Sequence, residues 1–222
     1  MSSGGAERRR IPDAIGAASF ILSLRARGVG DTGVLRAMEL VPREVFAPRR
    51  FADLSRRDLA LPLPCGQTMT APGTVAAMLV RLGVIPGNRV LEVGTGSGYT
   101  AALLARLGGQ VKTVERFETL AAAAAGHLKA AGLEDGVTVE LGDGLAPPGT
   151  ETFDRILVNG VAPAIPAVLV ERLAPKGCLV GAVVTDQGPR LVRIEQTDEG
   201  PREWMGSSVR LSPLLAGRSA AL

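Results

Sequence analysis

The feature that most constrains the fold of this chain is a glycine-rich turn between an apolar strand and an apolar helix. Val90-Leu91-Glu92-Val93 is followed by Gly94-Thr95-Gly96-Ser97-Gly98, and helical spacing begins at Tyr99. Such a turn lets a ligand approach bare backbone and the N-terminus of a helix. Glycines alone are a weak signal, but a strand before them and a helix after them strengthen it. The segment therefore predicts a ligand-binding strand–turn–helix unit of an α/β fold.

Strands and helices alternate after this turn. We expect strands at 89–92, 110–114, 137–141, 153–158 and 178–185, and helices at 99–107, 120–131 and 165–173. Two more strands, at 191–196 and 204–211, follow without helices between them. The pattern predicts a Rossmann-like, doubly wound and mostly parallel sheet with an antiparallel C-terminal hairpin.

The first third of the chain lacks this alternation. One helical pattern covers residues 15–27. A second helix is expected to begin at a cap formed by Asp31 or Thr32 and to end at Pro42, whereas residues 46–64 are irregular. Another helix is expected to begin near Pro72 and to end at Gly83. We therefore predict a disordered tail at 1–10, a helical and irregular extension at 11–71, the α/β domain at 72–215 and a tail at 216–222.

Composition excludes several classes of protein. The chain has 222 residues, of which 46% are hydrophobic and 21% are charged, so it is expected to fold around a hydrophobic core. The net charge is only +3 and aromatic residues are 3%, so a basic stripe with interleaved aromatics for nucleic acid is not expected. The arginine pairs are better explained as solvated helix faces. No apolar run reaches the roughly 18 residues of a membrane span.

Cysteine usage and the start of the chain point to a reducing compartment. Cys65 and Cys178 stand alone, without the spacing of a zinc or redox motif, so no metal is expected. Met1 to Arg10 is polar and lacks the apolar region of a signal peptide. We expect a cytoplasmic protein, and a monomer.

Acidic residues follow three consecutive strands of the predicted sheet. Glu92 precedes the glycines, Glu115 ends the second strand about 20 residues later, and Asp143-Gly144 follows the third. An acid in the position of Glu115 can accept hydrogen bonds from both ribose hydroxyls of a bound adenosine. Asp143 is placed to accept from an adenine amino group. The alternatives are a solvated Glu115 beside Arg116 and an ordinary turn aspartate.

The glycine spacing departs from the G-x-G-x-x-G of dinucleotide sites, so no pyrophosphate cradle is evident. A helix N-terminus also suits a ligand of amino-acid type, and S-adenosylmethionine carries an α-carboxylate and an α-ammonium. Glu92 either lies near that ammonium or holds the amides of the loop.

Several segments together resemble one family, the protein-L-isoaspartate O-methyltransferases. The likeness spans residues 34 to about 180, and the closing Val209-Arg210-Leu211-Ser212-Pro213-Leu214 is similar to the family's end. The glycine motif is shared by many methyltransferases, whereas Gly-Gln-Thr-x-x-x-Pro is specific to this family. The segments are 34–38 through 41–46, Gly66-Gln67-Thr68-Met69-Thr70-Ala71-Pro72, 90–99, Gly142-Asp143-Gly144 with Phe153-Asp154, and Ala162-Pro163-x-Ile165-Pro166 with Leu173-x-Pro175-x-Gly177.

The resemblance implies methyl transfer from S-adenosylmethionine to the side-chain carboxylate of isoaspartyl residues in damaged proteins. The ester then collapses to a succinimide, which hydrolyses partly to normal aspartate. A carboxylate is already ionised at neutral pH, so no general base is required, and His127 is expected to be a surface or packing residue. The candidate cofactor residues are Thr68, Met69, Glu92, Gly94, Thr95, Gly96, Glu115, Arg116, Asp143 and Gly144.

The chain departs from the family at two places that border the substrate side. Thr70 stands where the family has the serine treated as its active-site residue, which keeps the hydroxyl but stiffens χ1. Asn159-Gly160-Val161 replaces a small-residue stretch, and 180–186 replaces a Pro-Val-Gly segment. The Asn-Gly pair at 159–160 is of a kind that is prone to deamidation. The alternative explanation for this pair is a simple turn at the end of the strand. Two other functions stay open: a diverged enzyme that esterifies another carboxylate, and a cofactor-binding module without turnover.

Overall fold

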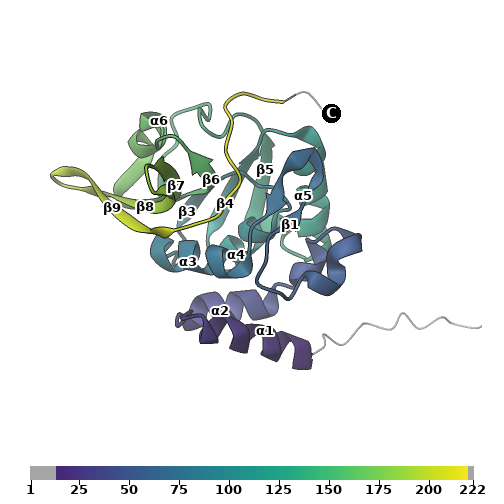
Figure 1. Ribbon diagram of the computed structural model, residues 1–222. Coiled ribbons are helices and arrows are strands. Elements are labelled where there is room, and N and C mark those ends of the chain that lie inside the picture. Colours follow the sequence, from purple (N-terminus) through teal and green to yellow (C-terminus); the bar gives the residue numbers. More distant parts are fainter. Residues whose placement is uncertain (1–13, 220–222) are drawn as a thin grey trace, which may run out of the picture.

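The computed structural model describes residues 14–219, and a seven-stranded sheet forms its centre (Figure 1). The strand order is β5-β4-β3-β6-β7-β8-β9. The first five strands are parallel neighbours, whereas β7–β8 and β8–β9 are antiparallel. The predicted fold class is confirmed. The strands are β3 (Arg89–Val93), β4 (Gln110–Glu115), β5 (Val137–Leu141), β6 (Phe153–Ala162), β7 (Leu173–Thr185), β8 (Gly188–Thr197) and β9 (Gly200–Ser208).

Successive residues of the strands face two different hydrophobic clusters, as the period of two requires. Val90 of β3 packs with residues of α3 (Pro72–Leu82), α4 (Tyr99–Arg106) and α5 (Glu118–Ala130). Its neighbour Leu91 belongs to a second cluster with Leu169 of the short helix α6 (Ala167–Glu171). Helices therefore cover both faces of the sheet, which makes it doubly wound.

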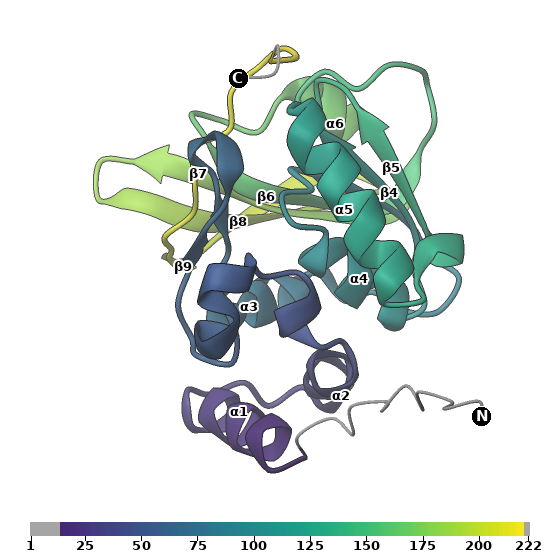
Figure 2. The same ribbon diagram turned by 90° about the vertical axis from the view of Figure 1, so that its right-hand side faces the viewer.

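The N-terminal extension packs on the same side as α3 and α4, where Figure 2 shows it below those helices. It contains α1 (Ala14–Ala26) and α2 (Thr32–Leu40), and Asp31 caps α2 by accepting from Val34 N at 2.8 Å. Phe46 of the extension is fully buried in the cluster that also holds Leu103 and Leu157. The extension thus shares its core with the sheet. The expected tail at 1–10 lies outside the described residues, as do residues 220–222.

The structure corrects the expected boundaries in two places that matter for the site. Within and around the irregular segment 46–64 there is a short hairpin, in which β1 (Leu61–Pro62) pairs with β2 (Thr68–Met69), and there are the 3-10 turns Arg43–Val45, Arg49–Leu54 and Pro64–Gly66. Strands of two residues are too short to show alternation in the sequence. Strand β6 runs on to Ala162 because Val161 and Ala162 pair with β7 after a register shift. Asn159 and Gly160 therefore lie within a strand and not in a strand-end turn.

Candidate active site

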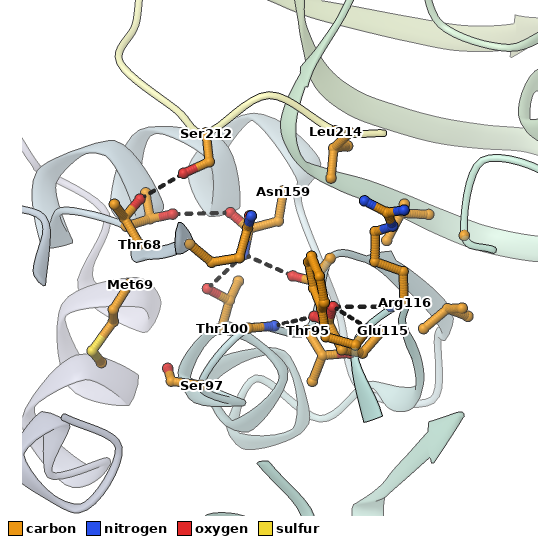
Figure 3. Close-up of a pocket in the computed structure, with 18 of the residues that line it drawn as sticks. Thr68, Met69, Thr95, Ser97, Thr100, Glu115, Arg116, Asn159, Ser212 and Leu214 are labelled. Atoms are coloured by element: carbon orange, nitrogen blue, oxygen red, sulfur yellow. Dashed lines mark hydrogen bonds between the residues drawn. The ribbon is translucent and has the colours of Figure 1, made fainter. Parts of the chain in front are cut away.

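A pocket lies at the ends of the strands β3 and β4, beside Asn159 of β6, and distant parts of the chain supply its walls (Figure 3). One wall is the glycine turn with the end of β4, and another is the hairpin residues 67–70. Asn159 and the C-terminal residues 212–215 complete it. Of the predicted site residues, those that line the pocket are Thr68, Met69, Thr70, Gly94, Thr95, Gly96, Glu115, Arg116 and Gly144. Glu92 and Asp143 are not among them.

The glycine turn has the backbone that its sequence predicts. Gly94, Gly96 and Gly98 have φ values of +91°, +54° and +87°, which side chains of L-residues rarely adopt. A Cβ on Gly94 would also approach the Asn159 carbonyl oxygen to 3.2 Å. At Gly144, a Cβ would meet Val93 Cγ1 at 2.6 Å. These glycines leave bare backbone beside the pocket, which fits a ligand that needs a close approach.

Glu115 holds the glycine turn and the start of α5 together. Its carboxylate accepts from the backbone N–H groups of Gly96 at 2.8 Å, Arg116 at 2.9 Å and Phe117 at 3.1 Å. A carboxylate has about four acceptor positions, so capacity for a further donor remains. The Glu115 side chain is therefore a charged acceptor on the pocket wall that also shapes the glycine turn. Only part of its acceptor capacity is left for two ribose hydroxyls.

Glu92 is fully buried and bonds to side chains, not to the amides of the loop. Its carboxylate accepts from Thr113 Oγ1 at 2.7 Å and from Asn159 Nδ2 at 3.2 Å. The Thr113 hydroxyl shares a further hydrogen bond of 2.7 Å with Thr95. Desolvation raises the pKa of Glu92 to about 8, although these hydrogen bonds act to lower it. A loop-pinning role is therefore not what the structure shows, and proximity to an ammonium stays a prediction.

Asp143 bonds to the C-terminal segment of the chain. One of its oxygens accepts from Leu145 N at 3.0 Å, and the other accepts from Gly217 N at 2.7 Å. Arg116 Nε donates to the Gly217 carbonyl at 2.9 Å. Two predicted cofactor residues thus fix residues that the sequence analysis assigned to a tail. Contact of Asp143 with an adenine ring stays a prediction.

The hairpin carries three predicted residues with different environments. Met69 is buried, and the Thr68 hydroxyl lies 2.8 Å from the hydroxyl of Ser212. The Thr70 hydroxyl is half-buried and donates to Asn159 Oδ1 at 3.2 Å. Figure 3 shows the labelled side chains of Thr68 and Ser212 meeting above Asn159.

Arg43 fixes the backbone of this hairpin from below and was not singled out by the sequence analysis. The guanidinium is 2% exposed and donates to the carbonyls of Ser55 at 2.8 Å, Leu59 at 3.1 Å and Thr70 at 3.1 Å. Burial lowers the pKa of Arg43 to about 10, so it stays charged at neutral pH. An arginine next to a proline in an amphipathic segment carries no signal of such a role. His127, as expected, is a packing residue: it is half-buried, lies edge-on to Phe46 and bonds to the Ser97 carbonyl at 2.9 Å.

A doubly wound sheet whose glycine turn faces one pocket together with Glu115 at the end of β4 is typical of the S-adenosylmethionine-dependent methyltransferases, the class to which this chain belongs. The chain belongs to the protein-L-isoaspartate(D-aspartate) O-methyltransferase family, since the model of that family matches residues 17–215. The predicted family and the predicted class of enzyme are both confirmed.

Known proteins similar to this chain agree with that assignment. It is 46% identical over 200 residues to protein-L-isoaspartate O-methyltransferase 2 of Rhodopseudomonas palustris (strain HaA2), covering 89% of this chain and 92% of that protein. It is 44% identical over 206 residues to a protein-L-isoaspartate O-methyltransferase of Xanthobacter autotrophicus, covering 92% and 94%. The crystal structure of a protein from Plasmodium falciparum, described as a "putative protein-L-isoaspartate O-methyltransferase" in complex with S-adenosyl-L-homocysteine, has the same fold. Its TM-score is 0.81 at 24% identity, with coverage of 89% and 97%.

Two features are absent from residues 14–219. No group of three or more His, Cys, Asp or Glu side chains in this part of the chain is arranged to hold a metal ion. In the same residues, no helix combines the length and the apolar character that crossing a membrane requires.

Proposed function

We propose that this protein methylates the side-chain carboxylate of isoaspartyl residues in damaged proteins, and so starts their repair. When bound, S-adenosylmethionine supplies a methyl group on a sulfonium: a carboxylate oxygen bonds to the methyl carbon as the carbon–sulfur bond breaks, which gives a methyl ester and S-adenosylhomocysteine. The residues of the pocket then have two tasks, to hold the cofactor and to orient the carboxylate.

The observation that carries the proposal is that Thr70 lies in the same pocket as the glycine turn and Glu115. Its hydroxyl can donate one hydrogen bond to a substrate carboxylate when the peptide displaces the Asn159 oxygen that accepts this bond in the structure. The carboxylate is ionised at neutral pH, so the site needs to align the reacting atoms and not to remove a proton. The described residues contain one histidine, and it packs away from this chemistry, which fits a reaction without a general base.

We propose that Gly94, Thr95 and Gly96 hold the amino-acid end of the cofactor, with Thr68 and Met69 over the methyl donor. Glu115 and Arg116 would contact the ribose, and Asp143 with Gly144 the adenine. Close backbone approach at Gly94 and Gly144 supports the placement. The acceptor capacity left on Glu115 supports its part in it. The cavity therefore fits the cofactor that its family uses.

An assay with a synthetic isoaspartyl peptide tests the proposal, with S-adenosylhomocysteine formation as the readout and a peptide of normal aspartate as the control. Thr70→Val keeps the shape of the side chain but removes the donor, so kcat/KM should fall about a hundredfold. Thr70→Ser keeps the donor and should retain activity. Methyl transfer to neither peptide would contradict the proposed function, and equal rates for the parent and Thr70→Val would remove Thr70 from it.

We further propose that the protein acts in the cytoplasm, as a monomer, on protein substrates and not on nucleic acid. Cys65 and Cys178 are both free thiols, which agrees with a reducing compartment. Light scattering on the purified protein tests the monomer. A dimer that persists on dilution would contradict that part of the proposal without touching the activity.

A further inference from the structure

We propose that Asn159 is a positioning residue that fixes the Thr70 hydroxyl relative to the glycine turn, using both ends of its amide. The inference rests on the proposed function, because it concerns how that site orients its substrate. Asn159 belongs to β6, Thr70 to the hairpin and Gly94 to the turn after β3. The side chain is half-buried at the point where these three elements meet.

Four hydrogen bonds converge on this amide. Its Nδ2 donates to Glu92 Oε1 at 3.2 Å and to the Gly94 carbonyl at 3.4 Å, and lies 3.3 Å from Thr100 Oγ1. Its Oδ1 accepts from the Thr70 hydroxyl at 3.2 Å. One side chain thus joins the substrate side of the pocket to the cofactor side.

The surroundings also fix which way the amide points. A backbone carbonyl accepts hydrogen bonds and cannot donate, so the side of the amide that faces Gly94 must be the NH₂. The carbonyl oxygen then faces Thr70 and fixes the position of its hydroxyl oxygen before substrate binds. The hydroxyl has one proton, so this hydrogen bond passes from Asn159 to the substrate carboxylate when the peptide binds. Glycine or another small residue at position 159 could hold neither Thr70 nor Gly94.

An Asn159→Asp variant separates the two ends of the amide. The oxygen that accepts from Thr70 is kept, whereas an oxygen replaces the NH₂ that faces Glu92 and Gly94. Two carboxyl groups about 3.2 Å apart share a proton at neutral pH, and that proton can bridge them as the amide did. The carboxylate of Glu115 also acts to raise the pKa of Glu92, after burial as the main cause, so it disfavours ionisation of the pair further.

The test compares the parent, Asn159→Ala, Asn159→Asp and Asn88→Ala for S-adenosylhomocysteine formation with an isoaspartyl peptide from pH 6 to pH 9. Asn88 is the matched control, because it caps an exposed turn through Ile85 N. We expect Asn159→Ala to lower kcat about tenfold to a hundredfold, because a misplaced positioning group costs rate more than affinity. Asn159→Asp should stay within about threefold of the parent at pH 6 and lose more than about tenfold at pH 9, as the shared proton leaves.

A double-mutant cycle shows whether Asn159 acts through Thr70. In a Thr70→Val background, Asn159→Ala should cost at least about fivefold less than in the parent. Effects that simply multiply would overturn the proposal. So would an Asn159→Ala variant that behaves like Asn88→Ala, or an Asn159→Asp variant with the pH profile of the parent.

A measurement of peptide binding distinguishes a failure of this inference from a failure of the proposed function. Calorimetry of the isoaspartyl peptide with protein saturated with S-adenosylhomocysteine needs no turnover. If the parent protein binds the peptide but forms no product, the proposed function is contradicted. The same double-mutant cycle, measured as Kd values for the peptide, then tests the role of Asn159. We expect a coupling of at least about threefold in Kd, and independent effects would overturn the role of Asn159. A parent that binds no peptide overturns both.

Discussion

The two sides of the pocket are held together in different ways. On the cofactor side, the Glu115 carboxylate binds backbone amides of Gly96, Arg116 and Phe117, all of which lie within 19 residues of it along the chain. On the substrate side, side chains bind side chains across 89 residues, from Thr70 to Asn159, and 144 residues, from Thr68 to Ser212. Backbone bonds tolerate changes of side chain, whereas side-chain pairs do not. The cofactor side is therefore set by a local motif, and the substrate side by the complete fold.

The largest expected effect concerns Glu92, which lies between the two sides. Its pKa is about 8 in the folded protein against 4.5 as the ordinary value, so the folded state binds more protons than the unfolded state in this pH range. The free energy of unfolding should then fall as pH rises from 5 to 8, by up to about 1.4 kcal/mol per pH unit from this group. In Glu92→Gln, that contribution should be absent. Urea denaturation of both proteins across this range measures it.

Glu203→Gln serves as the control, because Glu203 is exposed on β9. The difference in stability between Glu92→Gln and the parent should grow with pH, while that for Glu203→Gln should stay flat. Parallel curves for the parent and Glu92→Gln would mean that burial does not keep the Glu92 carboxyl protonated.

Glu115→Ala tests the cofactor side with the next largest effect. The variant removes a charged acceptor from the pocket and releases the amide of Gly96. We expect cofactor binding to weaken by roughly 1.5–3 kcal/mol, as for hydrogen bonds to a charged group. Calorimetry with S-adenosylmethionine measures the change, with Glu118→Ala, an exposed residue of α5, as the control. If both variants bind alike, Glu115 does not hold the ribose.

Thr68→Ala gives the smallest expected effect and probes the substrate side. The lost hydrogen bond to Ser212 is exposed, so it should contribute only about 0.5–1 kcal/mol. We expect the KM for the isoaspartyl peptide to rise about twofold to fivefold. Thr68→Ser, which keeps the hydroxyl, should restore the parent value. An unchanged KM in Thr68→Ala would show that this contact does not shape the peptide side.

The same contrast explains how far the sequence predicts this structure. The strand, the glycine turn and the acid at the end of β4 are close in sequence, so their spacing predicts Gly94, Gly96 and Glu115 as neighbours. Their positive φ values and amide hydrogen bonds agree with that expectation. The sheet was also predictable, because burial on two faces leaves long apolar runs in the strands.

The bonds of the substrate side were not predictable from spacing. Asn159 stood out only as a departure from the family, and nothing near it in sequence points to Thr70 or Glu92. Arg43 binds carbonyls, which carry no side-chain signal at all. Asp143 was placed correctly after β5, but its partner Gly217 lies 74 residues further on. Such contacts depend on which strands become neighbours, and a single sequence does not encode this locally.

The position of the C-terminal segment has a consequence for biosynthesis. Ser212 and Leu214 line the pocket and bond through the backbone to Val161, and Gly217 bonds to Asp143 and Arg116. A nascent chain that still lacks these residues can form the glycine turn and most of the sheet. One wall of the pocket is missing until residues 212–215 have been synthesised. The pocket is therefore completed only after the last strand of the sheet has been made, and a copy that stops before residue 212 lacks one of its walls.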